Sequence, residues 1–115
     1  MNVEKIIEEL KQKYPGKKII KNNEENTTEI ICEIEPGLAI AVIDRAEPHY
    51  HKKTTELYEV IKGEMVVGKD GREYKLKEGE KLEIFPNEVH YVTGNETWIK
   101  AYSEPAWTQE DHILK

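Results

Sequence analysis

Cysteine, arginine and long apolar runs are all scarce in this sequence, and each shortage excludes a class of protein. The single Cys32 cannot form a disulfide within the chain, and its neighbours Ile31 and Ile34 indicate an ordinary buried thiol. Arginine occurs only at Arg45 and Arg72, and the net charge is −6, so the basic face that nucleic acids and anionic membranes require is missing. No apolar stretch is long enough to span a membrane, and the N-terminus lacks the apolar core of a signal peptide. We therefore expect a cytoplasmic protein that binds neither nucleic acid nor membrane.

The first residues predict a short helix in front of a single domain. At 115 residues the chain is long enough for one hydrophobic core and too short for two. Within residues 1–16, Asn2 is a suitable N-cap and Pro15-Gly16 ends the helix. The apolar residues between them recur at helical spacing: Val3, Ile6, Ile7 and Leu10.

Residues 28–103 have a pattern typical of a β domain, because short apolar runs alternate with turn residues. The predicted strands cover residues 28–33, 38–44, 56–62, 64–69, 72–76, 81–85, 89–93 and 97–103. Many short strands without helices between them predict an all-β sandwich or barrel. The tail, residues 104–115, contains Trp107 and two large aliphatic residues, so we expect it to pack across the barrel or against a second subunit.

Three histidines and one glutamate form the pattern with the most chemical content. His49 and His51 project from the same face of an extended strand about 6 to 7 Å apart, and Glu56 and His90 follow. Neutral imidazoles with one carboxylate suit a divalent transition metal ion such as Fe, Mn, Ni, Cu or Zn. Solvent-exposed histidines on an acidic surface are the alternative explanation of the His-x-His pair taken alone.

The spacing of these residues resembles the cupin superfamily. The first cupin motif is filled by His49-x-His51, four residues, Glu56, six residues and Gly63, and the second is matched at Gly79 and His90. Four positions depart from the family pattern and are occupied here by Ile43, Phe85, Asn87 and Gly94. The resemblance implies a double-stranded β-helix, or jelly-roll barrel, with a short N-terminal helix. It also implies one metal ion held by His49, His51, Glu56 and His90.

The resemblance further implies roles for residues around the ion. Tyr58 has the same inward parity as Glu56, so it is either a hydroxyl that assists catalysis together with Glu56 or an aromatic residue of the core. His112 is the one histidine outside the motif, and a role as a fifth ligand or acid/base residue stays open. Trp98 and Trp107 are interpreted as core or interface aromatics rather than sugar platforms.

Three function hypotheses follow from this combination. The first is a metal-dependent enzyme that acts on a small oxygenated molecule, either as an isomerase of a sugar or sugar phosphate or by dioxygenase-like O₂ chemistry. The second is a non-catalytic module that binds a metal ion or small ligand. The third, a metal-free structural barrel, would leave buried ionisable groups unpaired at a cost in stability. Dimers are common among cupins, so a homodimer is expected.

Overall fold

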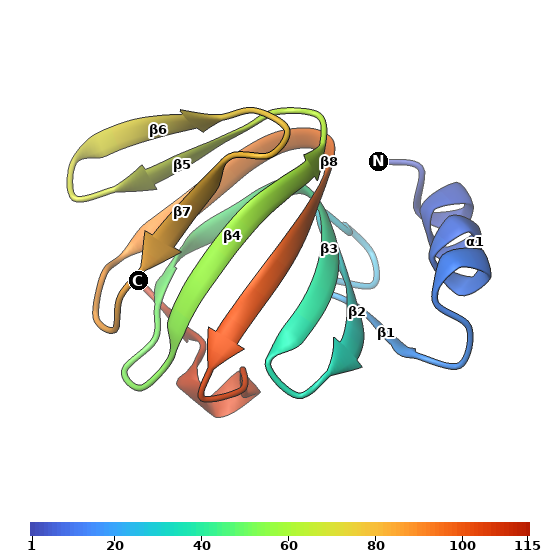
Figure 1. The fold of residues 1–115 in the computed structure, drawn as a ribbon, viewed down its shortest axis with the longest axis horizontal. Coiled ribbons are helices and arrows are strands. Elements are labelled where there is room, and N and C mark those ends of the chain that lie inside the picture. Colours follow the sequence, from blue (N-terminus) through green and yellow to red (C-terminus); the bar gives the residue numbers. More distant parts are fainter.

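The computed structural model describes residues 1–115 as one helix followed by an antiparallel β barrel (Figure 1). Helix α1 covers Val3–Lys13. The strands are β1 (Lys18–Lys21), β2 (Glu29–Glu35), β3 (Leu38–Tyr50), β4 (Thr55–Lys62), β5 (Met65–Lys69), β6 (Arg72–Leu76), β7 (Lys81–Ile84), β8 (His90–Glu104) and β9 (Ile113–Leu114). A short 3-10 helix, η1 (Gln109–Asp111), lies between β8 and β9. The predicted jelly-roll fold with a short N-terminal helix is confirmed.

Helix α1 packs against the outer face of the sheet, where it closes a small apolar cluster. The side chain of Asn2 accepts a hydrogen bond at 3.3 Å from a backbone N–H of the first turn, which confirms the predicted N-cap. Ile6 and Leu10 are buried, and their partners come from β2, β3 and β8: Ile30, Cys32, Ile40, Val42 and Trp98. Cys32 is therefore the buried thiol that was expected, and Trp98 is a core aromatic.

Strands β3 and β8 are long because each takes part in both halves of the barrel. The main sheet has the order β1-β2-β3-β8-β4-β7, while β5 pairs with β6 and β8, and β9 pairs with β3. The β3–β8 ladder shifts register between Ile43 and Arg45, and again between Ala46 and His49. Such irregularities bend a strand and increase its twist, which allows one sheet to close over itself.

The sequence predicted two strands where the structure has the single strand β8. Gly94-Asn95-Glu96 has the composition of a turn, but the structure keeps it inside the strand as an irregularity in the ladder. Glu96 has a φ of 47°, and a Cβ on Gly94 would lie 2.8 Å from the carbonyl oxygen of Ile43. Glycine is therefore needed because β3 passes close to β8 at this point. Strands β1 and β9 were not predicted.

The barrel interior is filled by an apolar cluster that draws on six strands, β3 to β8. Its members are Ala41, Ile43, Ala46, Tyr58, Val60, Met65, Val67, Leu76, Ile84, Val92 and Ile99. On β2, Ile31 packs against this cluster whereas Ile30 and Cys32 face α1. Because side chains alternate along a strand, Glu29 also faces the interior, beside its register partner Ile43. The barrel interior therefore holds a carboxyl group from β2 in addition to its apolar residues.

The one α-helix, α1, is neither long enough nor apolar enough to cross a membrane.

Candidate metal centre

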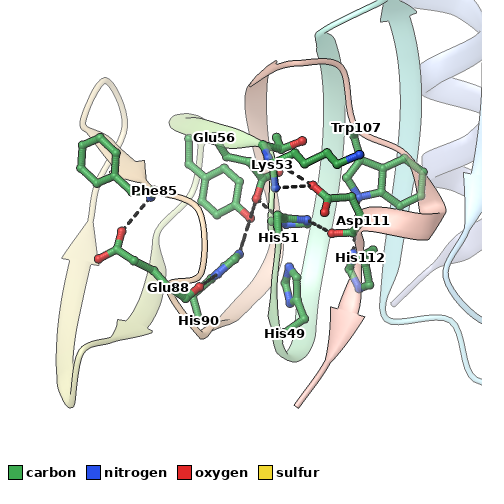
Figure 2. A network of polar contacts seen from close by, with 12 residues as sticks. His49, His51, Lys53, Glu56, Phe85, Glu88, His90, Trp107, Asp111 and His112 are labelled. Carbon is green, nitrogen blue, oxygen red and sulfur yellow. Dashed lines mark hydrogen bonds and ion pairs between the residues drawn. The ribbon is translucent and has the colours of Figure 1, made fainter.

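Three histidines and one glutamate meet inside the barrel (Figure 2). His49 lies near the end of β3, Glu56 near the start of β4, and His90 opens β8 as the register partner of His49. His51 follows directly after β3. All four side chains are buried, and their ligand atoms lie within 4.8 Å of one another. The four predicted ligand positions are thus brought together, although they come from different strands.

The two neighbouring histidines approach each other, but not on a common strand as the sequence suggested. Strand β3 ends at Tyr50, so His51 belongs to the loop that leads to β4. The rings of His49 and His51 have centroids 5.1 Å apart and an interplanar angle of 81°. The turn of the chain after Tyr50 therefore sets the direction from which His51 enters the site.

The Nδ1 atom of each of the three histidines is held by a backbone carbonyl. The contacts are His49 Nδ1 to Glu47 O at 2.7 Å, His90 Nδ1 to Glu88 O at 2.9 Å, and His51 Nδ1 to Asp111 O at 2.8 Å. A carbonyl oxygen only accepts, so each Nδ1 carries the proton and donates it. In a neutral ring the lone pair is then on Nε2, and this outer contact fixes both the tautomer and the ring orientation that a metal ligand needs.

Glu56 is the common neighbour of two of these rings and of Tyr58. Its Oε1 atom lies 2.9 Å from Nε2 of His51 and 3.5 Å from Nε2 of His90, and it accepts a hydrogen bond from the Tyr58 hydroxyl at 3.1 Å. The Tyr58 hydroxyl also lies 3.4 Å from Nε2 of His90. Despite its short distance to Glu56, Nε2 of His51 has no hydrogen-bond partner. It is therefore a buried ring nitrogen with an unsatisfied lone pair or proton.

The electrostatics of the cluster favour one positive charge among these groups. Burial opposes ionisation of Glu56, but the adjacent rings of His51 and His90 outweigh burial and hold the pKa of that carboxyl well below its usual range. Burial likewise opposes charge on His51, yet Glu56 outweighs it and raises the pKa of that ring. Burial, followed by the repulsion of His90, lowers the pKa of His49 to about 3, so His49 is neutral at pH 7. A proton on His51 supplies part of the positive charge that the cluster favours, and a bound divalent cation would supply more of it.

A transition metal ion fits the residues that are present. Three imidazole nitrogens and one carboxylate are a borderline donor set that suits Fe, Mn, Ni, Cu or Zn. The unpartnered Nε2 of His51 and the ionised Glu56 are the atoms that such an ion would satisfy. Four protein ligands leave one or two positions open when the ion is five- or six-coordinate. The cluster therefore has the composition of a site that can hold a divalent transition metal ion.

His112 lies beside the cluster but is not among its four members. Its ring stacks on His49 with centroids 4.2 Å apart and an interplanar angle of 15°. The indole Nε1–H of Trp107 donates to Nδ1 of His112 at 3.4 Å, so the proton of neutral His112 is on Nε2. Burial, followed by the charge of His51, lowers the pKa of His112. His112 is thus a neutral ring that packs against His49.

The contribution of Asp111 to the cluster was missed from the sequence. This residue belongs to η1, and β9 beyond it pairs with β3 at His49 and Tyr50, so the tail lies along the strand that bears His49. Its carbonyl holds His51, and its carboxylate accepts hydrogen bonds from the loop after His51 (Figure 2). These partners are about sixty positions apart in sequence and form no recognisable motif, so no sequence signal would have identified the residue.

Two further ionisable groups of the barrel interior are perturbed. Burial, followed by the negative charge of Glu56, raises the pKa of Glu29 to about 7. Burial, followed by the charges of Glu56 and Glu29, raises the pKa of Tyr58 well above its usual range. Tyr58 therefore keeps its proton at any physiological pH, whereas Glu29 changes its charge near neutrality.

Comparison with known proteins agrees with the fold and with the position of the cluster. A family model of the cupin domain matches residues 31–99, a stretch that contains all four clustered residues. No curated protein matches the sequence.

Several solved structures share the fold at low sequence identity. Pac13, a nucleoside dehydratase, superposes with a TM-score of 0.71 at 12% identity, over 89% of this chain and 90% of its own. KdgF from Halomonas sp. gives a TM-score of 0.65 at 15% identity, over 81% of this chain and 90% of that chain. The Fe(II) form of HppE gives a TM-score of 0.64 at 15% identity, over 76% of this chain and 56% of its own. At such identities the likeness establishes the fold alone.

Proposed function

The chain belongs to the cupin family, and we propose that it binds one divalent transition metal ion and acts on a small oxygenated molecule. The ligands in this proposal are His49, His51, Glu56 and His90. The observation that carries it is the common orientation of the three histidines. Each Nδ1 is tied to a backbone carbonyl, which leaves the Nε2 atoms for the ion beside a buried carboxylate.

The residues around the ion have distinct tasks in this proposal. A bound divalent ion would supply Lewis acidity toward a carbonyl or enediol oxygen, or redox chemistry with O₂. Glu56 stays ionised, and Tyr58 keeps its hydroxyl proton and donates it toward Oε1 of Glu56. These two residues are therefore the ones that we propose hold or move a proton near the reacting atoms.

Of the substrates that the proposal allows, an uncharged sugar or polyol is the first to test. Both reaction types that we propose, isomerisation of a sugar and dioxygenase-like O₂ chemistry, accept such a molecule. A phosphorylated sugar would require a free cation near the barrel opening. The exposed Arg45 is paired with Glu47 at 3.1 Å, whereas the exposed Lys52 and Lys53 directly follow His51 and form no ion pair. In the interior, a bound divalent ion would offset the charge of Glu56, which leaves Glu29 as the carboxyl group that would repel a phosphate dianion. Among structures of the same fold, Streptomyces Pac13 has been solved with uridine, a small oxygenated molecule.

Deep burial of the four ligands supports a second candidate, a non-catalytic module that holds a metal ion or a metal-bound ligand. The exposed fractions of the ligands range from 0% for His90 to 6% for Glu56. Such burial limits access for substrate exchange, whereas it strengthens the hold on an ion. The two candidates share the metal centre and differ only in turnover.

A substrate screen on metal-loaded protein separates the two candidates. Protein loaded with Fe(II), Mn(II) or Ni(II) is assayed for aldose–ketose interconversion and for O₂ uptake, with His51→Ala as the control that lacks a ligand. We expect turnover with at least one unphosphorylated sugar or related polyol, and none in the variant. If protein that is shown to hold its metal turns over no substrate in the screen, the result would favour the binding module.

We also propose that the chain forms a homodimer, as the family resemblance implies. Four large apolar side chains are exposed on its surface: Ile61, Phe85, Tyr102 and Leu114. Light scattering of the purified protein should give about twice the chain mass of 13.4 kDa. A single-chain mass at micromolar concentration would contradict the dimer and leave the metal site unaffected.

A further inference from the structure

His51 differs from the other two histidines of the cluster in how it is held. His49 and His90 each donate to a carbonyl two residues earlier in their own strand region, Glu47 and Glu88. The acceptor for His51 is the carbonyl of Asp111, in the C-terminal segment of the chain. One of the three rings therefore depends on a remote element for its orientation.

The side chain of Asp111 holds the loop that carries His51. Its Oδ1 accepts from the backbone N–H of Lys52 at 2.9 Å, and its Oδ2 accepts from those of Lys53 and Thr54, each at 3.1 Å. Three successive N–H groups that converge on one carboxylate form a tight anion-binding turn. The buried hydroxyl of Thr54 adds a bond to the carbonyl of Pro105 at 3.1 Å. The loop is thus fixed at its start by the Asp111 carbonyl and along its length by the carboxylate.

Apolar packing contributes little to holding the C-terminal segment in place. Helix η1 has no buried residue, and β9 contains only two residues, of which Leu114 is 68% exposed. A segment with so little buried apolar area opens at a small free-energy cost unless its polar contacts hold it. Asp111 therefore supplies many of the polar contacts that attach this segment to the barrel, beside the pairing of β9 with β3 and the half-buried Trp107 and Ile113.

We propose that Asp111 is a positioning residue of the metal centre, through which the docking of residues 105–115 and the binding of the metal ion are coupled. This inference rests on the proposed metal site. When the segment is docked, Nδ1 of His51 carries the proton and Nε2 faces Glu56. When the segment undocks, His51 loses the Asp111 carbonyl that accepts its Nδ1 proton. The loop after His51 then also loses the Asp111 carboxylate that holds its backbone N–H groups. Because coupling is reciprocal, the ion should in turn hold the segment closed.

The test compares Asp111→Ala with Glu110→Ala, which removes the same charge from an exposed neighbouring position of η1. Ni²⁺ is the probe, and its affinity is measured by competition with a chelator. Asp111→Ala should weaken Ni²⁺ binding by about ten- to a hundredfold, the usual effect of losing a residue that orients a ligand, and Glu110→Ala by less than about twofold. Asp111→Asn, which keeps an acceptor oxygen, should fall between them and guards against a variant that does not fold.

Two further readouts separate positioning from a general loss of structure. Hydrogen exchange at residues 52–54 and 105–115 should slow when Ni²⁺ binds the wild type, and should speed up in Asp111→Ala while the core strands stay unchanged. The ¹⁵N spectrum of metal-free wild type should show a proton on Nδ1 of His51 that is hydrogen-bonded, and Asp111→Ala should lose that hydrogen-bond signature. Equal affinity and equal His51 spectra in the two alanine variants would overturn the inference. If the wild type binds no Ni²⁺, the proposed metal site fails, and the ring spectra still decide whether Asp111 positions His51.

Discussion

Glu29 offers a quantitative test of the electrostatics inside the barrel. The residue faces the interior from β2 beside Ile43, and no ion pair or hydrogen bond compensates its side chain. Burial, and then the charge of Glu56, raise its pKa from 4.5 to about 7. Replacing it with glutamine keeps the shape and removes the charge, so Glu29→Gln should stabilise the metal-free protein at alkaline pH.

The direction and size of this effect follow from linkage. Because the pKa in the folded state is raised, the stability associated with the neutral carboxyl is complete below pH 4.5 and is lost as the pH rises through about 7. A rise from 4.5 to about 7 corresponds to about 3 kcal/mol, which is an upper value because the side chain is partly exposed. The increase in the free energy of unfolding caused by Glu29→Gln should therefore be near zero at pH 4.5 and reach about 2–3 kcal/mol above pH 8.

Urea denaturation of wild type and variant from pH 4.5 to pH 9 measures this difference. Glu35→Gln, at the exposed end of the same strand, controls for the loss of a carboxylate from β2. A bound cation neutralises Glu56, so saturating metal should reduce the gain. A gain from Glu29→Gln that is the same at all pH values, or a variant that is less stable above pH 8, would refute the reasoning.

Three other predictions concern the ion, its neighbour and the helix. A metal ion at a hundred times its dissociation constant should stabilise the wild type by about 2.7 kcal/mol in thermal unfolding, and His90→Ala should show no such shift. Tyr58→Phe removes the hydroxyl bonded to Glu56, so it should still bind one ion but lose most turnover, and unchanged turnover would contradict a catalytic hydroxyl. Leu10→Ala should cost about 2–5 kcal/mol in urea denaturation because Leu10 is fully buried. Metal stoichiometry should not change in that variant, and a loss of metal would show that α1 supports the site.

The fold and the four clustered residues were accessible from the sequence because their signals are local or have a fixed spacing. The N-cap at Asn2 and the apolar spacing after it lie within a few residues of each other, and both were found in α1. His49, His51 and Glu56 lie within one short motif, and His90 has its own motif. The jelly-roll topology then explains why these separate motifs meet in one place.

The features that were missed depend on contacts between distant parts of the chain. Gly94-Asn95 has turn composition, and only the close passage of Ile43 shows that β8 continues through it. Strand β1 has few residues and is defined by its pairing with β2 rather than by its own pattern. Asp111 resembles any surface aspartate in sequence, because the three N–H groups that define its role lie in the loop after His51.

Metal analysis of untagged protein tests the central claim most directly. Wild type is compared with His51→Ala and with His112→Ala, which loses an imidazole beside the cluster but outside its four members. The account predicts about one transition metal ion per chain in the wild type and in His112→Ala, and only traces in His51→Ala. Trace metal in all three proteins after reconstitution, or an equal content in wild type and His51→Ala, would contradict a metal centre built from His49, His51, Glu56 and His90.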